Sequence, residues 1–395
     1  MTTAMAPAAA FDNADRLKKL PPYLFVEIDK AKRKLQAEGK DVIDLGVGDP
    51  DLPTPPHIIA KLKTAADDPA NHRYSFTEGM PQLRQAIAAW YQRRFNVTLN
   101  PDTEVLPLLG SKEGIAHLPL ALANPGDAVL VPDPCYPPYR SGTLFAGADV
   151  VPMPLLDERG FFPDFGDISQ KAMRRAKILF LNYPNNPTAA TATAEQFTEA
   201  IALAKEYGVA VAHDAAYSEV CFDGYRPMSF LELPDAKSVG IEFHSLSKTY
   251  NMTGWRIGWA CGNAKLLAAL NQLKTNVDSG IFQPVQWAGI EALEGDQQPM
   301  AEAVAIIQQR RDLLVDGLAG AGWTVPKPKA TFYIWARVPG QESSMAFAAR
   351  LLQQSHVVIT PGVGFGPSGE GYVRLSLTIP TERLQEAVAR LAKAL

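Results

Sequence analysis

The segment 245–258 combines residue types that could bind a carbonyl compound covalently and hold a phosphate beside it. It opens with Ser245-Leu246-Ser247-Lys248, directly after an apolar run at 238–243 that is typical of a buried strand. A lysine at a strand end, between hydroxyl residues, is suited to form a Schiff base with a carbonyl group. Arg256 follows eight positions later and brings a planar fork of donors that suits a phosphate. The segment therefore predicts a reactive amine next to a phosphate clamp formed by Ser245, Ser247 and Arg256.

This combination predicts pyridoxal phosphate as the cofactor. Gly254 and Gly258 flank the arginine and would let the backbone approach a ligand closely. A Ser-x-Ser-Lys string alone occurs by chance in a long chain. The spacing, the two glycines and the leading strand make chance a poor explanation, and contacts elsewhere in the chain decide the matter.

Two strand-end motifs offer contacts to the ring of such a cofactor. Asp214 follows an apolar run at 208–212, where a carboxylate would pair with the pyridinium nitrogen and keep it protonated. Tyr217 would reach the phenolic oxygen of the ring. Asn186, which two prolines hold in the loop 182–188, would donate to the same oxygen. Each motif alone would be an ordinary strand-end turn, but the presence of the lysine motif favours a cofactor site.

Ser111, Lys112 and Tyr136 are further candidates, and the latter two have structural alternatives. The string 109–114 opens a helical stretch whose free amides and Ser111 hydroxyl predict a second phosphate contact. Lys112 would face the phosphate or the substrate, whereas a solvated lysine at a helix start is the alternative. Tyr136 would stack on the ring, although an aromatic residue among prolines is often only packing.

Arg374 is the candidate for substrate binding. It lies in the string 371–376, which predicts a half-buried strand. A charge there needs a partner, and a bidentate guanidinium suits a substrate carboxylate. A structural ion pair with another side chain explains the residue equally well from the sequence alone.

An alternation of strands and helices must position these motifs. Short apolar runs of the buried-strand type lie at 128–131, 178–181, 209–212, 239–243 and 257–260. Helical patterns separate many of them, such as 193–207, which Gly208 ends. This alternation predicts an α/β fold with a mostly parallel sheet. Ligands of such sheets bind beyond the carboxyl ends of the strands, where the polar motifs fall.

The ends of the chain predict a second, smaller α+β domain. A long helix at 301–318, strands at 331–338 and 372–377, and a last helix at 381–395 follow the α/β region. A charged helix at 30–39 leads to a short strand and a Gly- and Pro-rich loop within 41–51. The predicted division is a disordered tail at 1–12, an N-terminal segment at 13–49 that joins the small domain, a large domain at 50–295 and a small domain at 296–395.

The whole chain reads as a cytoplasmic enzyme. Its 395 residues exceed one usual hydrophobic core, which favours two domains. A formal net charge of −4 gives no electrostatic reason to expect nucleic acid or a membrane surface as partner. The three cysteines are scattered without metal-ligand spacing or a disulfide framework, which suits a reducing compartment and predicts no metal. No apolar run has the length of a membrane span.

Taken together, these motifs resemble the class I/II aminotransferases of the fold-type-I pyridoxal-phosphate superfamily, from about residue 15 to the end of the chain. The Asn-Pro-Thr loop, the Asp-x-x-Tyr pair and the Ser-x-Ser-Lys stretch with its arginine carry the resemblance. Within the family the chain is most similar to the LL-diaminopimelate aminotransferases, in the strings 20–25, 44–51, 110–117 and 182–188. Aspartate- and alanine-type relatives share parts of these strings.

The resemblance implies a role for each candidate. Lys248 would form the Schiff base with the cofactor and move the proton between substrate Cα and cofactor C4′. Asp214 would pair with the ring nitrogen, Tyr217 and Asn186 would bond the phenolic oxygen, and Tyr136 would stack on the ring. The phosphate would be surrounded by Ser111, Lys112, Ser245, Ser247 and Arg256. Tyr74 resembles a tyrosine that reaches the phosphate of the neighbouring subunit, so the resemblance implies a homodimer.

The resemblance also implies the substrates, which are small amino and oxo acids. The implied substrate contacts are Tyr23, Gly46, Lys112, Asn186, Asn276 and Arg374, with Arg374 on the α-carboxylate and Asn276 acting across the subunit interface. The implied reaction is ping-pong transfer from LL-diaminopimelate to 2-oxoglutarate, giving tetrahydrodipicolinate and glutamate in lysine and cell-wall synthesis. An aspartate-, alanine- or aromatic-type aminotransferase is the first alternative. β-Elimination or aminocyclopropane-carboxylate synthesis, and a non-catalytic regulator, are the others.

Two positions depart from the family pattern. Ala189 takes the place of the usual glycine after Asn-Pro-Thr, which would cost about 1 kcal/mol if the backbone there has positive φ. Thr77 stands where plant-type enzymes carry a carboxylate, so the contact to the distal ammonium of the substrate stays open, with adjacent Glu78 as a candidate.

Overall fold

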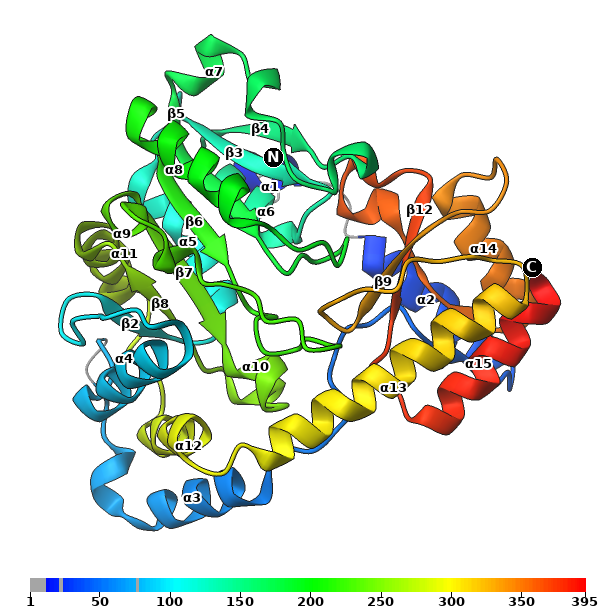
Figure 1. Ribbon diagram of the computed structural model, residues 1–395, viewed down its shortest axis with the longest axis horizontal. Helices are drawn as coiled ribbons and strands as arrows, with labels where there is room; N and C mark the ends of the chain where they lie inside the picture. Colours follow the sequence, from blue (N-terminus) through cyan, green and yellow to red (C-terminus); the bar gives the residue numbers. More distant parts are fainter. Residues whose placement is uncertain (1–11, 21–23, 76–77) are drawn as a thin grey trace, which may run out of the picture.

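The computed structural model describes residues 12–20, 24–75 and 78–395. Its larger part is built on a seven-stranded sheet with the order β2-β8-β7-β6-β5-β3-β4 (Figure 1). The strands are β2 (Val105–Leu108), β3 (Ala128–Asp133), β4 (Asp149–Pro154), β5 (Ala176–Asn182), β6 (Ala210–Asp214), β7 (Gly240–Ser245) and β8 (Gly258–Gly262). Every neighbouring pair from β7 to β4 is parallel, and only β8 runs antiparallel to its two neighbours. The predicted α/β fold with a mostly parallel sheet is confirmed.

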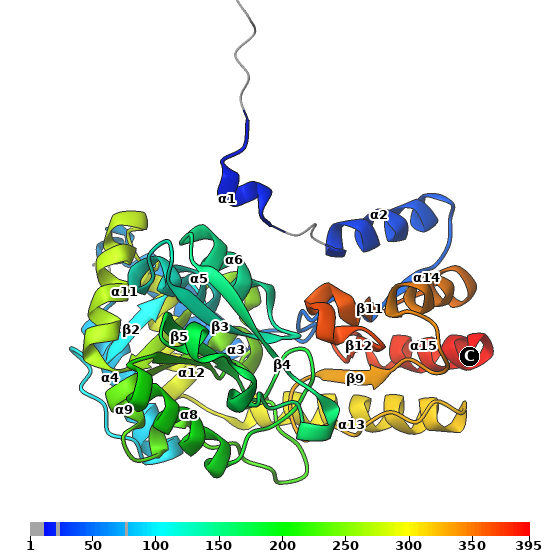
Figure 2. The ribbon, with the colours of Figure 1, turned by 90° about the horizontal axis from the view of Figure 1, so that it is seen from above.

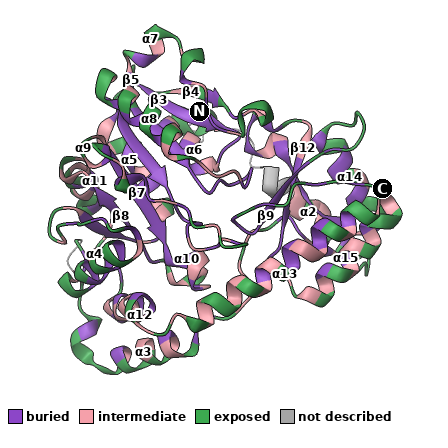
Figure 3. Ribbon diagram, in the orientation of Figure 1, coloured by how far each residue is buried: buried purple, intermediate pink, exposed green. Residues whose placement is uncertain are grey.

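Helices cover both faces of this sheet. Alternate strand residues, such as Val129 and Leu130, belong to two different core clusters because successive side chains point to opposite faces. One face packs on α5 (Ser111–Leu122), α6 (Pro137–Phe145) and α11 (Ala264–Val277). The other packs on α3 (Pro56–Asp67), α4 (Pro81–Phe95), α8 (Ala194–Tyr207) and α12 (Gln283–Glu294). The central strands are therefore buried on both sides, as Figure 3 shows, which explains their continuous apolar runs.

Local sequence sets the ends of α8 as the pattern predicts. The Thr193 side chain accepts a hydrogen bond from the Gln196 amide, and the Gln196 side chain caps the Thr193 amide in return. Gly208 ends the helix in the left-handed region, with φ 68°. The short helices of this part are α7 (Gln170–Met173), α9 (Ala236–Val239) and α10 (Leu246–Thr249).

The smaller part joins the two ends of the chain (Figure 2). β1 (Ile43–Asp44) pairs in parallel with β10 (Val357–Val358), and β9 (Tyr333–Arg337), β11 (Thr360–Pro361) and β12 (Tyr372–Ser376) form an antiparallel sheet in the order β11-β12-β9. Its helices are α2 (Leu24–Ala37), α13 (Gln298–Gly320), α14 (Ser344–Ser355) and α15 (Thr381–Ala394), and α1 (Asp15–Lys18) precedes them. Ile43 and Leu45 share a core with Leu314 and Leu375.

The sequence placed most of these elements correctly and some of their limits wrongly. The helix expected at 30–39 begins at Leu24 and ends at Ala37, and the strand expected within 41–51 is only two residues long. The predicted tail at 1–12 falls almost wholly outside the described residues, and the division into domains stays a prediction. Within the described residues, no helix is both long and apolar enough to span a bilayer.

Candidate active site

A cleft of about 470 Å³ opens beyond the carboxyl ends of the central strands, between the larger and smaller parts. The predicted residues that line it are Ser111, Lys112, Tyr136, Asn186, Asp214, Tyr217, Ser245, Ser247, Lys248, Arg256 and Arg374. Strand topology explains their convergence: Asp214 is the last residue of β6 and Ser245 the last of β7. Because β8 is antiparallel, its first residue pairs with Ser245, which returns Arg256 to the same edge.

Lys248 presents its amine to the cleft from α10. Its Nζ donates to the Gly48 carbonyl at 3.2 Å and lies 5.6 Å from the centre of the Phe332 ring. No carboxylate among the described residues lies within ion-pair distance of this amine. The arrangement leaves the Lys248 amine available for reaction with a carbonyl group.

The predicted phosphate clamp is a group of donors around the start of α5. Ser111 is the first residue of that helix, whose N-terminal amides suit an anion. Arg256 donates to the carbonyls of Thr253 at 2.7 Å and Leu109 at 3.3 Å, and no carboxylate of the described chain pairs with it. A Cβ at Gly258 would crowd the His244 carbonyl and the Ser111 amide. Close backbone packing therefore requires this glycine, rather than the ligand approach that the sequence suggested.

Asp214 is a buried carboxyl group without a cationic partner. Burial raises its pKa above the ordinary value, against hydrogen bonds from the Tyr139 hydroxyl at 2.8 Å and the Ala216 amide at 3.2 Å. No lysine, arginine or histidine nitrogen of the described residues lies within ion-pair distance of its carboxylate oxygens. A ligand with a cationic nitrogen at this place would therefore stabilise the charged carboxylate.

Arg374 lies across the cleft, 4 % exposed, on β12. Its Nη1 donates to Asn186 Oδ1 at 2.8 Å and its Nη2 to the Gly46 carbonyl at 2.7 Å, while its Nε has no partner among the described residues. The rings of Tyr333 and Phe365 flank the guanidinium at 4.1 and 4.6 Å. No carboxylate in the described part of the chain pairs with Arg374, so the alternative of a structural ion pair is wrong. The bond to Arg374 occupies Asn186 Oδ1 and leaves the Asn186 Nδ2 group as a donor.

Sequence reasoning missed two tyrosines, of which Tyr333 lines the cleft and Tyr139 is fully buried. Tyr139, which holds Asp214, stands three residues from Tyr136 in the string 134–139, and nothing in that string distinguishes the two. Tyr333 accepts a hydrogen bond from the Tyr217 hydroxyl at 3.3 Å, and burial raises the pKa of Tyr217 well above its usual value. A Cβ at Gly48 would overlap the Tyr333 hydroxyl. The sequence placed Tyr333 only within the strand expected at 331–338.

Several predicted residues do not line this cleft. Tyr74 is 87 % exposed. Asn276 is also exposed, and its Nδ2 donates to the Gln272 carbonyl of its own helix at 2.8 Å. Gly46 is buried behind the cleft, where its carbonyl holds Arg374. Tyr23 and Thr77 lie outside the described residues, and Glu78 is exposed.

The comparisons with known proteins agree with this geometry. Residues 40–391 match the family Aminotransferase class I and II. LL-diaminopimelate aminotransferases from Syntrophobacter fumaroxidans and Dehalococcoides mccartyi are 58 % and 56 % identical, over 97 % and 95 % of this chain and 99 % and 97 % of their own lengths. The substrate-bound structure of BacF from Bacillus subtilis superposes with a TM-score of 0.93 at 42 % identity, covering 97 % of this chain and 98 % of that one.

Proposed function

This chain belongs to the class I and II aminotransferases, and we propose that it transfers the α-amino group of LL-diaminopimelate to 2-oxoglutarate, with pyridoxal phosphate as cofactor. One observation carries the chemistry: the same cleft is lined by the Lys248 amine, the buried Asp214 carboxyl group and the buried Arg374 guanidinium, none of which has an ionic partner among the described residues. The curated relatives named for LL-diaminopimelate support the amino donor.

The donors and acceptors of the cleft fit pyridoxal phosphate. Its phosphate matches the amides at the start of α5, the hydroxyls of Ser111, Ser245 and Ser247, and the Arg256 guanidinium. Its ring nitrogen matches Asp214, because a cation there offsets the burial that raises the pKa of this carboxyl group. When bound, the cofactor supplies an aldehyde for the amino group and a ring that stabilises negative charge at the substrate Cα.

The residues of this chain then bind, orient and move a proton. Arg374 offers charged donors to the α-carboxylate, with its guanidinium oriented by Asn186 and the Gly46 carbonyl. The Lys248 Nζ takes a proton from the substrate Cα and returns it, acting as general base and then as acid. The Asn186 amide would donate to the phenolic oxygen, as would the Tyr217 hydroxyl once its proton turns from Tyr333. Tyr136 would pack on the ring face.

We further propose that the working unit is a homodimer with sites shared between subunits. Tyr74 and Asn276, the two expected cross-subunit contacts, both lie on the surface outside their own cleft. Their segments are adjacent, because Ser75 Oγ donates to the Ile281 carbonyl at 2.9 Å. Exposed apolar side chains accompany them there, with Val277 56 % and Phe282 50 % exposed. A second copy of the chain would bury this apolar surface. Cytoplasmic location is proposed as well, on the three free cysteines.

A panel of amino donors with 2-oxoglutarate tests the amino-donor assignment. LL-diaminopimelate carries a second ammonium and a second carboxylate at its far end. If the site binds both, an amino donor that lacks one of them leaves polar groups of the protein unpaired. We expect its kcat/KM to exceed that of lysine and of aspartate by at least about a hundredfold, or about 2.7 kcal/mol. The meso isomer should be much poorer, because fixed polar groups would read the far stereocentre.

The same panel separates the alternatives. Comparable efficiency with aspartate, alanine or phenylalanine would assign the chain to the general aminotransferases and leave the cofactor contacts untouched. Release of pyruvate and ammonia, or formation of aminocyclopropane-carboxylate, would instead indicate a different reaction in the same cleft.

A further inference from the structure

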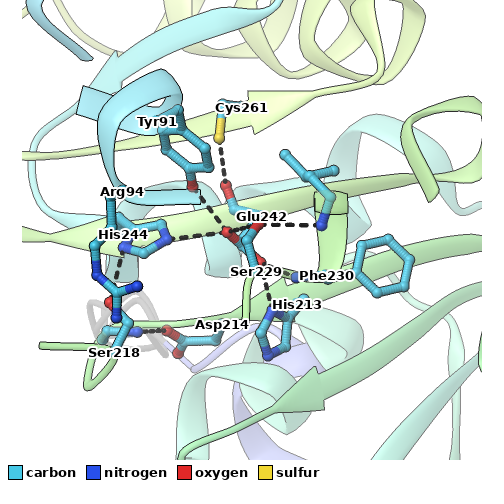
Figure 4. A network of polar contacts seen from close by, with 12 residues as sticks. Tyr91, Arg94, His213, Asp214, Ser218, Ser229, Phe230, Glu242, His244 and Cys261 are labelled. Atoms are coloured by element: carbon cyan, nitrogen blue, oxygen red, sulfur yellow. Dashed lines mark hydrogen bonds and ion pairs between the residues drawn. The ribbon is translucent and has the colours of Figure 1, made fainter. Parts of the chain in front are cut away.

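Glu242 of β7 is a fully buried carboxylate behind the cleft (Figure 4). Five donors surround it: the Tyr91 hydroxyl at 2.9 Å, the Ser229 hydroxyl at 2.7 Å, His244 Nε2 at 3.0 Å, His213 Nδ1 at 2.8 Å and the Phe230 amide at 2.8 Å. Burial alone would raise the pKa of Glu242, but the hydrogen bonds from the two histidines outweigh it and hold this pKa well below its usual range. The ionised form of Glu242 is therefore the form that this environment stabilises.

His213 is fully buried between two groups that accept hydrogen bonds. Its Nδ1 faces Glu242 Oε2 at 2.8 Å, and its Nε2 faces the Tyr183 carbonyl at 3.0 Å. A neutral imidazole has only one N–H group, and a carbonyl oxygen can only accept. With a carboxylate at Glu242 and a neutral His213 ring, one ring nitrogen would face an acceptor without a proton. Both contacts are therefore hydrogen bonds only if the His213–Glu242 pair holds one additional proton. The Tyr91 and Ser229 hydroxyls and the Phe230 amide already donate to Glu242. Their geometry favours the ring over the carboxylate as the place of that proton.

His244 contacts the same carboxylate without this requirement. Its Nε2 donates to Glu242 Oε1 at 3.0 Å, and its Nδ1 faces the Ser218 hydroxyl at 3.5 Å. Because a hydroxyl can donate, a neutral ring satisfies both contacts of His244. One buried negative charge and one buried positive charge remain, and such a pair avoids the cost of an isolated buried ion.

The Tyr183 carbonyl connects this ion pair to the substrate end of the cleft. It belongs to the loop that follows β5, in which Asn182 Oδ1 accepts from the Asn186 amide at 2.8 Å. Asn182 Nδ2 donates to the Asp214 carbonyl at 2.7 Å, which ties the loop to β6. Asn186 in turn holds the Arg374 guanidinium. His213 points to the opposite face of the sheet from its neighbour Asp214, so it supports this loop from behind.

We propose that His213 is a positioning residue: held as an imidazolium by Glu242, it anchors the Tyr183 carbonyl and thereby fixes Asn186 and Arg374 for the substrate carboxylate. This rests on the proposed function only in taking Arg374 as the carboxylate site. Loss of the anchor should weaken the binding of every carboxylate substrate, whichever amino donor the enzyme prefers.

Two matched variants test the positioning role. His213→Phe and His244→Phe each remove one donor from Glu242 and keep an aromatic ring, but only His213 contacts the Tyr183 carbonyl. We expect His213→Phe to raise the KM for donor and for 2-oxoglutarate about tenfold, with a smaller change in kcat, and His244→Phe to change KM less than about twofold. Calorimetric binding of glutarate, a dicarboxylate without an amino group, to the holoenzyme should weaken in the same proportion. Equal effects of the two variants would reduce His213 to a structural residue and overturn the proposal.

Nitrogen NMR of the wild-type protein tests the charge without any variant. The chain has six histidines, so selective 15N labelling resolves their rings, and the contacts of the His213 ring with the rings of Phe197 and Phe230 assign its signals. Both His213 nitrogens should show the shifts of protonated nitrogens in the folded protein, while His244 shows one protonated and one bare nitrogen. A neutral His213 ring overturns the proposal, even where a variant fails to fold. Failure of the LL-diaminopimelate assignment would instead appear in the donor panel and leave both of these results unchanged.

Discussion

Single residues in the cleft hold reactive groups that the rest of the described chain leaves unmatched. Asp214 is buried with its pKa raised, and the Arg374 guanidinium keeps one nitrogen without a partner. In the same cleft the Lys248 amine contacts the Gly48 carbonyl and the Phe332 ring, with no carboxylate of the described residues in ion-pair distance. Such unmatched groups lower the stability of the protein without a ligand. A ligand that brings the complementary charge offsets this cost when it binds.

Lys248→Ala should abolish transamination while leaving the fold intact, because no ion pair of the described chain depends on this amine. We expect kcat to fall at least about a thousandfold, or about 4 kcal/mol of barrier. Borohydride treatment of the wild-type holoenzyme should fix the cofactor covalently to the peptide that contains Lys248, as detected by mass spectrometry. Recovery of the same adduct from the variant would show that another amine carries the chemistry.

Asp214→Asn should change the pH dependence of the stability of the cofactor-free protein. Because burial raises the pKa of Asp214, the folded chain holds this proton more tightly than the unfolded chain. Its contribution to stability therefore falls as pH rises from about 4 through the folded pKa. Over this pH window the unfolding free energy of the wild type should fall relative to that of the variant. Saturating pyridoxal phosphate should cancel this fall in the wild type and leave the pH dependence of the variant unchanged. A difference that does not vary with pH would contradict this reading.

At the scale of elements, the loop after β5 carries the departure at Ala189. The structure gives this residue φ 58°, inside the left-handed region, and buries all but 8 % of it. The sequence predicted backbone strain at Ala189 if φ is positive there, and this condition is met. A glycine at position 189 would remove the strain but also the buried methyl group. The two changes affect the free energy of unfolding in opposite directions, each by about 1 kcal/mol.

Substitutions at Ala189 should therefore differ sharply. We expect Ala189→Gly to change the free energy of unfolding by less than about 1 kcal/mol, with kcat/KM within about twofold of wild type. Ala189→Val should destabilise the protein by about 2 kcal/mol, because a β-branched side chain is strongly disfavoured in this region. Urea unfolding of both variants measures the difference, and a valine variant as stable as wild type would show that the loop relaxes out of the left-handed region.

Elements also show how far the sequence could predict the site. The buried strands and the residues at their carboxyl ends were predictable, because apolar runs and strand-end positions are local features. The antiparallel direction of β8 was not, since the same kind of apolar run serves either direction. The contact between Tyr217 and Tyr333 joins positions 116 residues apart, across two parts of the molecule. The buried Glu242 network depends likewise on partners from α4, β6 and the segment after Ser229, which no single string of sequence reveals.

In the whole molecule, residues of the larger and the smaller part line the cleft, but the two residues expected to act across the subunit interface do not. The long helix α13 begins beside the larger part and extends along the smaller part (Figure 1), so it connects the two parts that line the cleft. Tyr74 and Asn276 are exposed instead, on segments that the hydrogen bond from Ser75 to the Ile281 carbonyl joins. A second copy of the chain that covers this surface could bring both side chains to its partner's cleft.

Mixed dimers test this sharing of residues between subunits. In a dimer of one Tyr74→Phe and one Lys248→Ala protomer, one site has both substitutions and the other has neither, provided that Tyr74 acts across the interface. If each variant alone is strongly impaired, unfolding and refolding an equal mixture should restore about a quarter of wild-type activity, because about half of the dimers are mixed and each has one intact site. Lys248→Ala mixed with the double variant Tyr74→Phe/Lys248→Ala has no intact site and should stay inactive. A mixture that gains nothing over its components would place Tyr74 in its own subunit's site or outside the chemistry, and full activity from a monomer at assay concentration would reject the shared site altogether.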